Sequence, residues 1–354
     1  MINFCCIDCS SLLHVDQEHL ICSTCGKRYP IEGGLYLFPG SDFYYSDSSP
    51  EEMRELIINC KKQGWLAAAL QSFKEKPFVV DIIADETRAD WQYLIDLPFN
   101  STILDIGAGW GTLSVALARN FKHVVALEGT KDRLEFARIR AEQEGISNLT
   151  TVHADFFKHP FQNGQFDLVS FNGVLEWVGM GSKSENPRNR QVEALKLAYE
   201  LLKEGGYLYI GIENAYGLKY LLGDPDDHTG VKYITYLERQ EANLLNQKQN
   251  GMDYRTFTYN MDGYINLLHE ASFSNVEFFC PYPDYKRIES LHNLSNTNVT
   301  KFQLDIMRAS SPRDERKERA IDIGYLLNGF DTMKQFTNSY SILARKRENY
   351  ATSN

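Results

Sequence analysis

The feature that most constrains the fold is a glycine-rich turn between an apolar strand and an amphipathic helix. From Thr102 the sequence reads TILDIGAGWGTLSVALAR, so a buried strand breaks at Gly107, Gly109 and Gly111 before a helix begins. Such a turn forms a ligand site at the carboxyl end of a strand in open α/β sheets. The dinucleotide fingerprint G-x-G-x-x-G would need glycine at position 112, which is Thr. The turn therefore predicts an α/β ligand site that departs from that fingerprint.

The strands that follow also end in residues suited to binding. HVVALEGT (123–130) places Glu128 where its carboxylate can accept hydrogen bonds from both hydroxyls of a ribose. LTTVHADF (149–156) places Asp155 at the next strand end, and FDLVSFNGVLEWV (166–178) supplies a fourth strand and turn. All these positions fall at the carboxyl edge of the predicted sheet, where ligands bind.

The rest of the chain continues the alternation of strands and helices. We expect a helix over 186–202 that ends at the glycines 205–206, strands over 206–213, 275–282 and 339–346, and a helix over 261–271. Alternating elements imply a mostly parallel sheet with helices on both faces. The predicted fold class is therefore α/β.

These motifs together resemble the class I S-adenosylmethionine-dependent methyltransferases, over residues 85–282 and the last strand. The resemblance implies a seven-stranded Rossmann-like sheet with an antiparallel last strand, and S-adenosylmethionine as the cofactor. The strings DDHTG, PYPDY and GVLEWV are also similar to bacterial methyltransferases of glycan or secondary-metabolite pathways.

The resemblance implies cofactor contacts at matching positions. The methionine end of the cofactor would contact Asp105, Gly107, Ala108, Gly109, Trp110 and Gly111, and the ribose would contact Glu128 and Gly129. The adenine would lie between Asp155 and Phe156, and the sulfonium would lie above Asn172, Gly173 and Val174. Arg88 is a candidate partner for the cofactor carboxylate, with a surface salt bridge as the alternative.

Four cysteines near the amino terminus have metal-ligand spacing. Cys6 and Cys9 form one C-x2-C pair, Cys22 and Cys25 form another, and 12 residues separate the pairs. This spacing is typical of a zinc ribbon, in which four thiolates close the coordination shell of one structural zinc ion. Cys5 is an alternative to Cys6, and disulfides or unligated thiols are the competing interpretations.

The methyl acceptor is predicted less directly. A hydroxyl must lose its proton, and His228, followed by Asp227 and Glu176, are the candidate catalytic residues for that step. The alternative for DPDD is a turn whose Asp side chains bond the local backbone, and a metal at this Asp-Asp-His sequence is a further alternative. Aromatic residues that can line an acceptor pocket, or simply pack, are Trp177, Tyr216, Tyr254, Tyr282 and Tyr285.

Charge and organisation complete the prediction. The chain has 37 basic and 47 acidic residues, and its first 100 residues carry a net charge of −7, which argues against nucleic acid as the partner. We expect a zinc ribbon at 1–40, a linker and helical cap at 41–100, and a methyltransferase core at 101–354 with insertions at 214–258 and 284–335. No apolar run of about 18 residues occurs, so a cytoplasmic protein without a membrane span is expected.

Three functions remain open at this point. The first is methyl transfer to a hydroxyl, or secondly an amine, of a small metabolite or saccharide. The second is RNA base methylation guided by the zinc ribbon, and the third is a non-catalytic scaffold. The ribbon is also a candidate contact for a protein partner.

Overall fold

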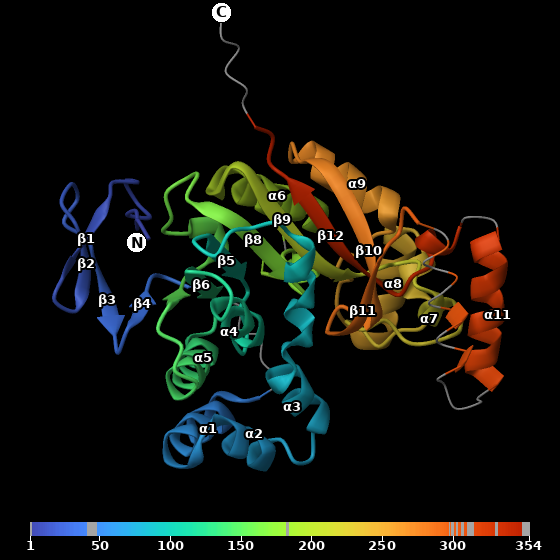
Figure 1. Ribbon diagram of the computed structural model, residues 1–354, viewed down its shortest axis with the longest axis horizontal. Helices are drawn as coiled ribbons and strands as arrows, with labels where there is room; N and C mark the ends of the chain where they lie inside the picture. The colour runs from blue at the N-terminus through green and yellow to red at the C-terminus, as the bar shows by residue number, and fades with distance from the viewer. Residues whose placement is uncertain are drawn as a thin grey trace, which may run out of the picture. The chain divides into compact units, whose positions relative to one another are not determined.

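The computed structural model describes residues 2–348 except 41–47, 182–183, 297, 299–300, 302–303, 306–307, 310–314 and 330–331. The chain divides into two compact units, and Figure 1 labels their helices and strands. The first comprises 1–171, 196–208 and 346–354, and the second comprises 172–195 and 209–345. Part of the expected linker, 41–47, lies outside the described residues. The division into ribbon, cap and core stays a prediction.

The first unit begins with short antiparallel strands, and the cysteine pairs lie before β1 and at the end of β2. The strands are β1 (Leu13–Asp16), β2 (His19–Cys22), β3 (Arg28–Glu32) and β4 (Leu35–Leu37). Gly33 and Gly34 form the turn between β3 and β4, with φ of 56° and 89°. Two positive φ values suit the tight turn of a hairpin, and glycine adopts them without a steric penalty. Strand β4 then pairs in parallel with β7 (Leu149–His153), so the ribbon extends the main sheet at its edge.

A helical cap follows in the same unit. It consists of α1 (Pro50–Gln63), α2 (Trp65–Ser72), α3 (Pro77–Ala84) and the 3₁₀ helix η1 (Glu86–Leu94). Ser49 begins α1 with a capping box, because its hydroxyl accepts from the Glu52 amide and the Glu52 carboxylate accepts from the Ser49 amide. The apolar face of the cap packs on Trp110 and Phe136, which fixes the cap beside the glycine-rich turn.

The central strands are parallel and nearly continuous in apolar residues. They are β5 (Thr102–Ile106), β6 (His123–Glu128), β7 and β8 (Phe166–Asn172), and the order in the first unit is β1-β2-β3-β4-β7-β6-β5-β8-β9. Helices α4 (Thr112–Ala118) and α5 (Lys131–Gln143) connect them. Strands buried on both faces lack polar alternation, which explains why the sequence revealed them.

The second unit completes the sheet with antiparallel strands. Strand β9 (Leu202–Glu213) begins in the first unit and ends in the second, where the order is β9-β12-β10-β11. Strand β12 (Ser339–Arg345) is antiparallel to β10 (Ser274–Asp284), and β11 (Arg287–Asn293) is antiparallel to β10 on its other side. The predicted α/β class and antiparallel last strand are confirmed.

The remaining helices connect these strands. They are η2 (Phe156–Lys158) in the first unit, α6 (Pro187–Leu201) across both, and η3 (Leu175–Trp177), α7 (Leu218–Leu221), η4 (Ile234–Tyr236), α8 (Arg239–Asn250), α9 (Met261–Glu270), α11 (Glu315–Gly329) and η5 (Met333–Gln335) in the second. Helix α6 ends at Leu201, four residues before the predicted glycine terminus. Lys203 forms an ion pair with Asp167 of β8 at 2.7 Å, so this stretch already belongs to the sheet and Gly205 lies inside β9.

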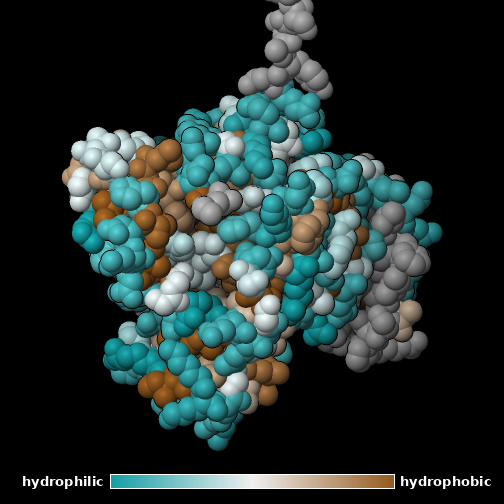
Figure 2. Space-filling view, turned by 60° about the vertical axis from the view of Figure 1, so that its left-hand side comes forward, coloured by the Kyte–Doolittle hydropathy of each residue, from teal (hydrophilic) through white to brown (hydrophobic). Residues whose placement is uncertain are grey.

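The surface of the cap exposes several large apolar side chains. Ile58, Leu66, Leu70 and Phe78 are 43–57% exposed, and Figure 2 shows apolar patches at the foot of the molecule, where α1 to α3 lie. In the part of the chain that the structure describes, no helix has both the length and the apolar character needed to cross a membrane.

Candidate active site

The glycine-rich turn of the first unit is held by Glu128. The Gly109 amide donates to Glu128 Oε2 at 3.0 Å, and the Thr130 amide donates to Glu128 Oε1 at 2.9 Å. Gly111 has φ of 75°, and a Cβ there would lie 2.4 Å from the Cβ of Ala137. The turn therefore brings backbone close to its neighbours, and Glu128 stays half-buried beside it.

Asp105 lies fully buried beneath the turn. The Ser114 and Ser170 hydroxyls donate to its two carboxylate oxygens at 2.5 and 2.9 Å. Burial raises the pKa of Asp105 to about 6, although both hydroxyls and nearby Arg88 favour its charged form. Asp105 thus ties α4 and β8 to β5 and contributes a charge whose presence depends on pH.

Two other candidates for the methionine end of the cofactor differ in their surroundings. The Nε atom of Arg88 is buried without a hydrogen-bond partner, while its Nη1 donates to the Ile82 carbonyl at 3.5 Å. The ring of Trp110 instead packs edge-on against Phe73 and Phe136, at centroid distances of 5.7 and 5.3 Å. Arg88 therefore has an unused donor, and so does Trp110, whose buried Nε1 has no hydrogen-bond partner.

The candidate adenine residues lie just after β7. Asp155 accepts from the Phe157 amide at 3.0 Å and so begins η2, and the half-buried Phe156 packs edge-on against Phe171 at 5.6 Å. The Gly129 carbonyl lies 3.0 Å from Nε2 of His153. A flat apolar ring and a fixed carboxylate are thus available at this strand end.

In the second unit, the residues predicted beneath the sulfonium follow β8. The Gly173 amide donates to the Gly211 carbonyl of β9 at 2.8 Å, and Gly173 has φ of 71°. The Oδ1 atom of Asn172 is buried without a partner, and Val174 leads into η3. Asn172 therefore offers an unused acceptor at the end of β8.

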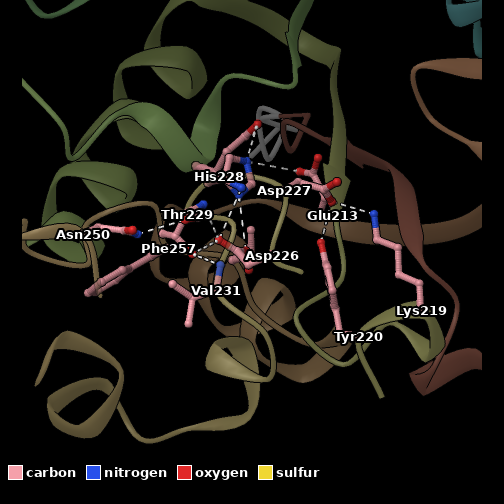
Figure 3. Close-up of polar contacts among 12 residues, drawn as sticks. Glu213, Lys219, Tyr220, Asp226, Asp227, His228, Thr229, Val231, Asn250 and Phe257 are labelled. Carbon is pink, nitrogen blue, oxygen red and sulfur yellow. Dashed lines mark hydrogen bonds and ion pairs between the residues drawn. The ribbon is translucent and has the colours of Figure 1, made fainter. Parts of the chain in front are cut away.

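A cluster of buried acidic residues around one histidine lies in the second unit, and we call Glu176, Glu213, Asp226 and His228 the acid–histidine cluster. His228 Nε2 lies 3.7 Å from Glu176 Oε1. Nε2 also lies 3.8 Å from Glu213 Oε2, and Nδ1 lies 3.6 Å from Asp226 Oδ1 (Figure 3). The His228 side chain is 4% exposed and the three carboxylates are 1% exposed. Three buried acids around one imidazole are rare without a function.

Local backbone geometry places His228. Oδ2 of Asp226 accepts from the Thr229 amide and hydroxyl at 2.8 and 2.7 Å, and the Gly230 amide donates to the Asp226 carbonyl at 2.9 Å. The predicted turn with a capping Asp is therefore present, and it directs His228 into the cluster. The loop DDHTG is therefore both a turn capped by an Asp side chain and the segment that carries the candidate catalytic residue His228.

Glu213 and Lys286 were not among the residues predicted from the sequence. Lys286 Nζ lies 2.7 Å from Glu213 Oε1, and the Tyr285 hydroxyl donates to the same oxygen at 3.0 Å. Glu213 ends the apolar strand GYLYIGIE, just as Glu128 ends HVVALE. That shared position, a carboxylate at a strand end, is the signal that could have identified it.

The carboxylates shift the pKa values of the cluster. Burial alone would lower the pKa of His228, but Asp226, Glu176 and Glu213 raise it to about 10. Burial raises the pKa of Glu176. Burial acts in the same direction on Glu213, but Lys286 and His228 reverse it and hold the pKa of Glu213 below its usual range. The carboxylates therefore favour the protonated form of His228.

Asp227, a further catalytic candidate, is already paired. Its Oδ2 lies 2.5 Å from Lys219 Nζ and accepts from the Tyr220 hydroxyl at 2.6 Å (Figure 3). The loop thus directs Asp226 and His228 toward each other within the cluster, whereas Asp227 contacts Lys219 and Tyr220 of α7.

The aromatic candidates separate into two groups. Trp177 packs edge-on against His228 at 5.0 Å, and Tyr285 is buried against Glu213. Tyr216 stacks on Tyr236, Tyr254 packs in an apolar cluster with Val231, Ile234 and Ala242, and Tyr282 pairs with Ser290 between β10 and β11. Trp177 and Tyr285 are therefore the two that join the acid–histidine cluster.

The predicted zinc ligands converge at the amino terminus. Cys6 and Cys25 have sulfurs 3.6 Å apart, those of Cys9 and Cys22 are 3.4 Å apart, and all four lie within 4.8 Å of one another. Tetrahedral zinc with Zn–S bonds of about 2.3 Å places its sulfurs about 3.8 Å apart. The four thiols fit that geometry, whereas Cys5 is not part of the group.

The sheet order and the turn at its edge define the class of α/β proteins that bind a ligand at strand ends, and sequence comparison specifies the family. Residues 99–250 match a family model described as a methyltransferase domain. The ubiquinone biosynthesis O-methyltransferase of Aeromonas salmonicida (strain A449) is 30% identical over 172 residues, which span 44% of this chain and 68% of that protein. The chain belongs to the S-adenosylmethionine-dependent methyltransferases.

Other relatives match over shorter stretches. N-methyltransferase 4 of Papaver somniferum is 28% identical over 144 residues, which cover 39% of this chain and 37% of that protein. The demethylmenaquinone methyltransferase of Clavibacter sepedonicus is 37% identical over 108 residues, covering 30% and 39%. The chain thus spans well under half the length of these two relatives.

Solved structures with a similar fold include a possible histamine N-methyltransferase of Thermotoga maritima. It is 16% identical with a TM-score of 0.44, and the match covers 78% of this chain and 97% of that one. A phosphoethanolamine N-methyltransferase 2 of Haemonchus contortus is 14% identical with a TM-score of 0.43, over 86% and 62%.

Proposed function

We propose that the protein transfers a methyl group from S-adenosylmethionine to a hydroxyl, or secondly an amine, of a small metabolite or saccharide. The observation that carries this proposal is the unpartnered oxygen Oε2 of Glu176, buried beside His228. Glu176 follows Val174, the last residue expected beneath the sulfonium, by two positions. A buried carboxylate that can take a proton, so close in sequence to the residues expected beneath the sulfonium, suits methyl transfer to a hydroxyl.

Several residues of the chain fit the cofactor. The unpartnered Nε of Arg88 suits the methionine carboxylate, and Asn172, which we expect beneath the sulfonium, has an unpartnered Oδ1. Glu128, Gly129, Asp155 and Phe156 would hold the ribose and adenine. When bound, the cofactor would supply a methyl group on a positively charged sulfur. Transfer to the acceptor oxygen would break the carbon–sulfur bond, and the neutral sulfur would keep the electron pair of that bond.

The chain must therefore orient the acceptor and receive its proton. Glu176 and His228 would receive that proton as a pair, since Oε1 of Glu176 and Nε2 of His228 are 3.7 Å apart. Asp227 would act through charge, because Lys219 and Tyr220 hold its carboxylate. Alignment of the acceptor supplies the larger part of the rate enhancement, because the leaving group needs no activation.

The acceptor is proposed to be small and uncharged or cationic. Trp177 packs against His228 and Tyr285 bonds to Glu213, so aromatic rings adjoin the cluster, as suits a sugar or planar ring. Tyr216, Tyr254 and Tyr282 would lie farther along the acceptor. The net charge of −10 opposes a nucleic-acid substrate.

The four cysteines are proposed to bind one structural zinc ion. Their sulfurs fit a tetrahedral shell, and four thiolates leave no position for water or substrate. Zinc would hold together β1 to β4, whose few apolar residues form a small core. The same module remains a candidate contact for a protein partner.

Methyl-labelled cofactor tests the proposal. The protein is incubated with it and an extract of the source organism, and the products are separated by size and by nuclease sensitivity. Label in small, nuclease-resistant material that is lost with Glu176→Gln and kept with Glu241→Gln, an exposed residue of α8, supports the proposal. Label in nuclease-sensitive material favours RNA methylation, and the absence of any label with retained cofactor binding favours a scaffold.

A further inference from the structure

The acid–histidine cluster has the composition and spacing of a metal site. Glu176, Glu213 and His228 each offer one ligand atom, and these atoms lie within 4.8 Å of one another. We propose that these three residues bind one divalent cation of the Mn²⁺ and Mg²⁺ class. This site is separate from the four cysteines and involves the second unit alone.

The distances suit a single small ion. Ligand atoms bound to one ion at about 2.1 Å lie about 3.0 Å apart when adjacent and about 4.2 Å apart when opposite. Nε2 of His228 lies 3.7 Å from Glu176 and 3.8 Å from Glu213, between these limits. Small side-chain rotations would bring all three atoms to one centre.

Unused hydrogen-bonding capacity points to a missing ligand. Oε2 of Glu213, the atom that faces His228, is buried without a hydrogen-bond partner, and Oε2 of Glu176 is also unpartnered. Both side chains are 1% exposed. A buried carboxylate oxygen without a donor is costly, and a cation bound to Oε2 of Glu213 and to both oxygens of Glu176 would satisfy both unpartnered atoms.

Charge and ligand type select the cation. Two carboxylates balance the charge of a divalent ion, and carboxylate oxygens suit Mn²⁺ and Mg²⁺, with one imidazole tolerated best by Mn²⁺. Lys286 lies on the other oxygen of Glu213 at 2.7 Å and so weakens the site without occupying the facing atom. Three protein ligands leave open positions for water or substrate.

The open positions give the ion a role that rests on the proposed function. A divalent ion bound there would hold the acceptor oxygen and lower the pKa of its hydroxyl, as metal ions do for bound water. The proton would pass to a carboxylate of the cluster or to solvent.

Binding of Mn²⁺ to the full-length, zinc-loaded protein tests the site without any methyl transfer. We expect one bound Mn²⁺ per chain. Electron paramagnetic resonance measures this binding. Glu213→Gln and Glu176→Gln should each weaken binding at least about tenfold, because each removes a charged ligand. Glu241→Gln, which removes an exposed carboxylate from the same unit, should bind as the wild type does.

A gain-of-binding variant protects the test against misfolded proteins. Lys286→Gln removes the ammonium beside Glu213 and should tighten Mn²⁺ binding by about tenfold or more. Absence of Mn²⁺ binding at millimolar concentrations, or binding unaffected by Glu213→Gln, overturns the proposal and leaves an imidazolium paired with three acids. Calorimetry of cofactor binding is measured separately, so failure of the metal site and failure of the methyltransferase proposal remain distinguishable.

Discussion

Replacing Asp105 by an uncharged asparagine should change how the stability of the protein depends on pH. Asp105 is fully buried, and its pKa is raised from 3.8 to about 6 mainly by burial. Between these two values the folded protein binds a proton that the unfolded chain does not. The stabilising contribution of Asp105 is therefore full below about pH 4 and is lost as the pH rises through 6.

The expected size follows from those two values. Integrating the difference in bound protons from pH 4.5 to pH 7.5 gives a loss of about 2 kcal/mol for the wild type. The amide introduced by Asp105→Asn carries no charge at either pH, so the variant should not show this loss. Its altered hydrogen bonds to Ser114 and Ser170 shift both ends of the profile equally.

Urea unfolding of both proteins at pH 4.5 and 7.5, without cofactor, measures this difference. Other groups also titrate over this range, and comparison with the variant removes their effect. Asp96→Asn, at an exposed position, is the matched control and should give a profile parallel to that of the wild type. Parallel profiles for Asp105→Asn and the wild type would refute the reasoning.

Three further predictions concern other parts of the molecule. Gly111→Ala should lower stability by about 2 to 4 kcal/mol in urea unfolding, because its Cβ would meet Ala137 at 2.4 Å; a stable variant would contradict the geometry. Cys22→Ser should lose the bound zinc, as measured by elemental analysis, and should have a lower melting temperature. Unchanged stoichiometric zinc would contradict the four-cysteine zinc site. Tyr285→Phe should slow methyl transfer about tenfold with cofactor affinity unchanged, since it removes a donor to Glu213; an unchanged rate would exclude that role.

Much of the fold was predictable because its strands are buried on both faces. The runs at 102–106, 123–128 and 166–172 are nearly continuous in apolar residues, and each ends at a polar residue or glycine. Strand β11 was not predicted, because RIESLHN mixes charged and apolar residues without a regular alternation. Edge strands depend on their partner more than on their own sequence.

The site was predictable only where its residues are local in sequence. His228 was found because DDHTG is polar just after an apolar helix, and Glu128 because it ends a strand. Glu213 and Lys286 lie 73 residues apart, and their ion pair exists only because β9 and the β10–β11 hairpin meet within one unit. Pairings of that range cannot be inferred from residue types in one sequence.

Calorimetric titration with S-adenosylmethionine tests the central claim most directly. We expect one bound cofactor per chain for the wild type and no detectable binding for Gly109→Arg, because a side chain at this positive-φ glycine would fill the turn. No binding by the wild type, or equal binding by the variant, would contradict the account.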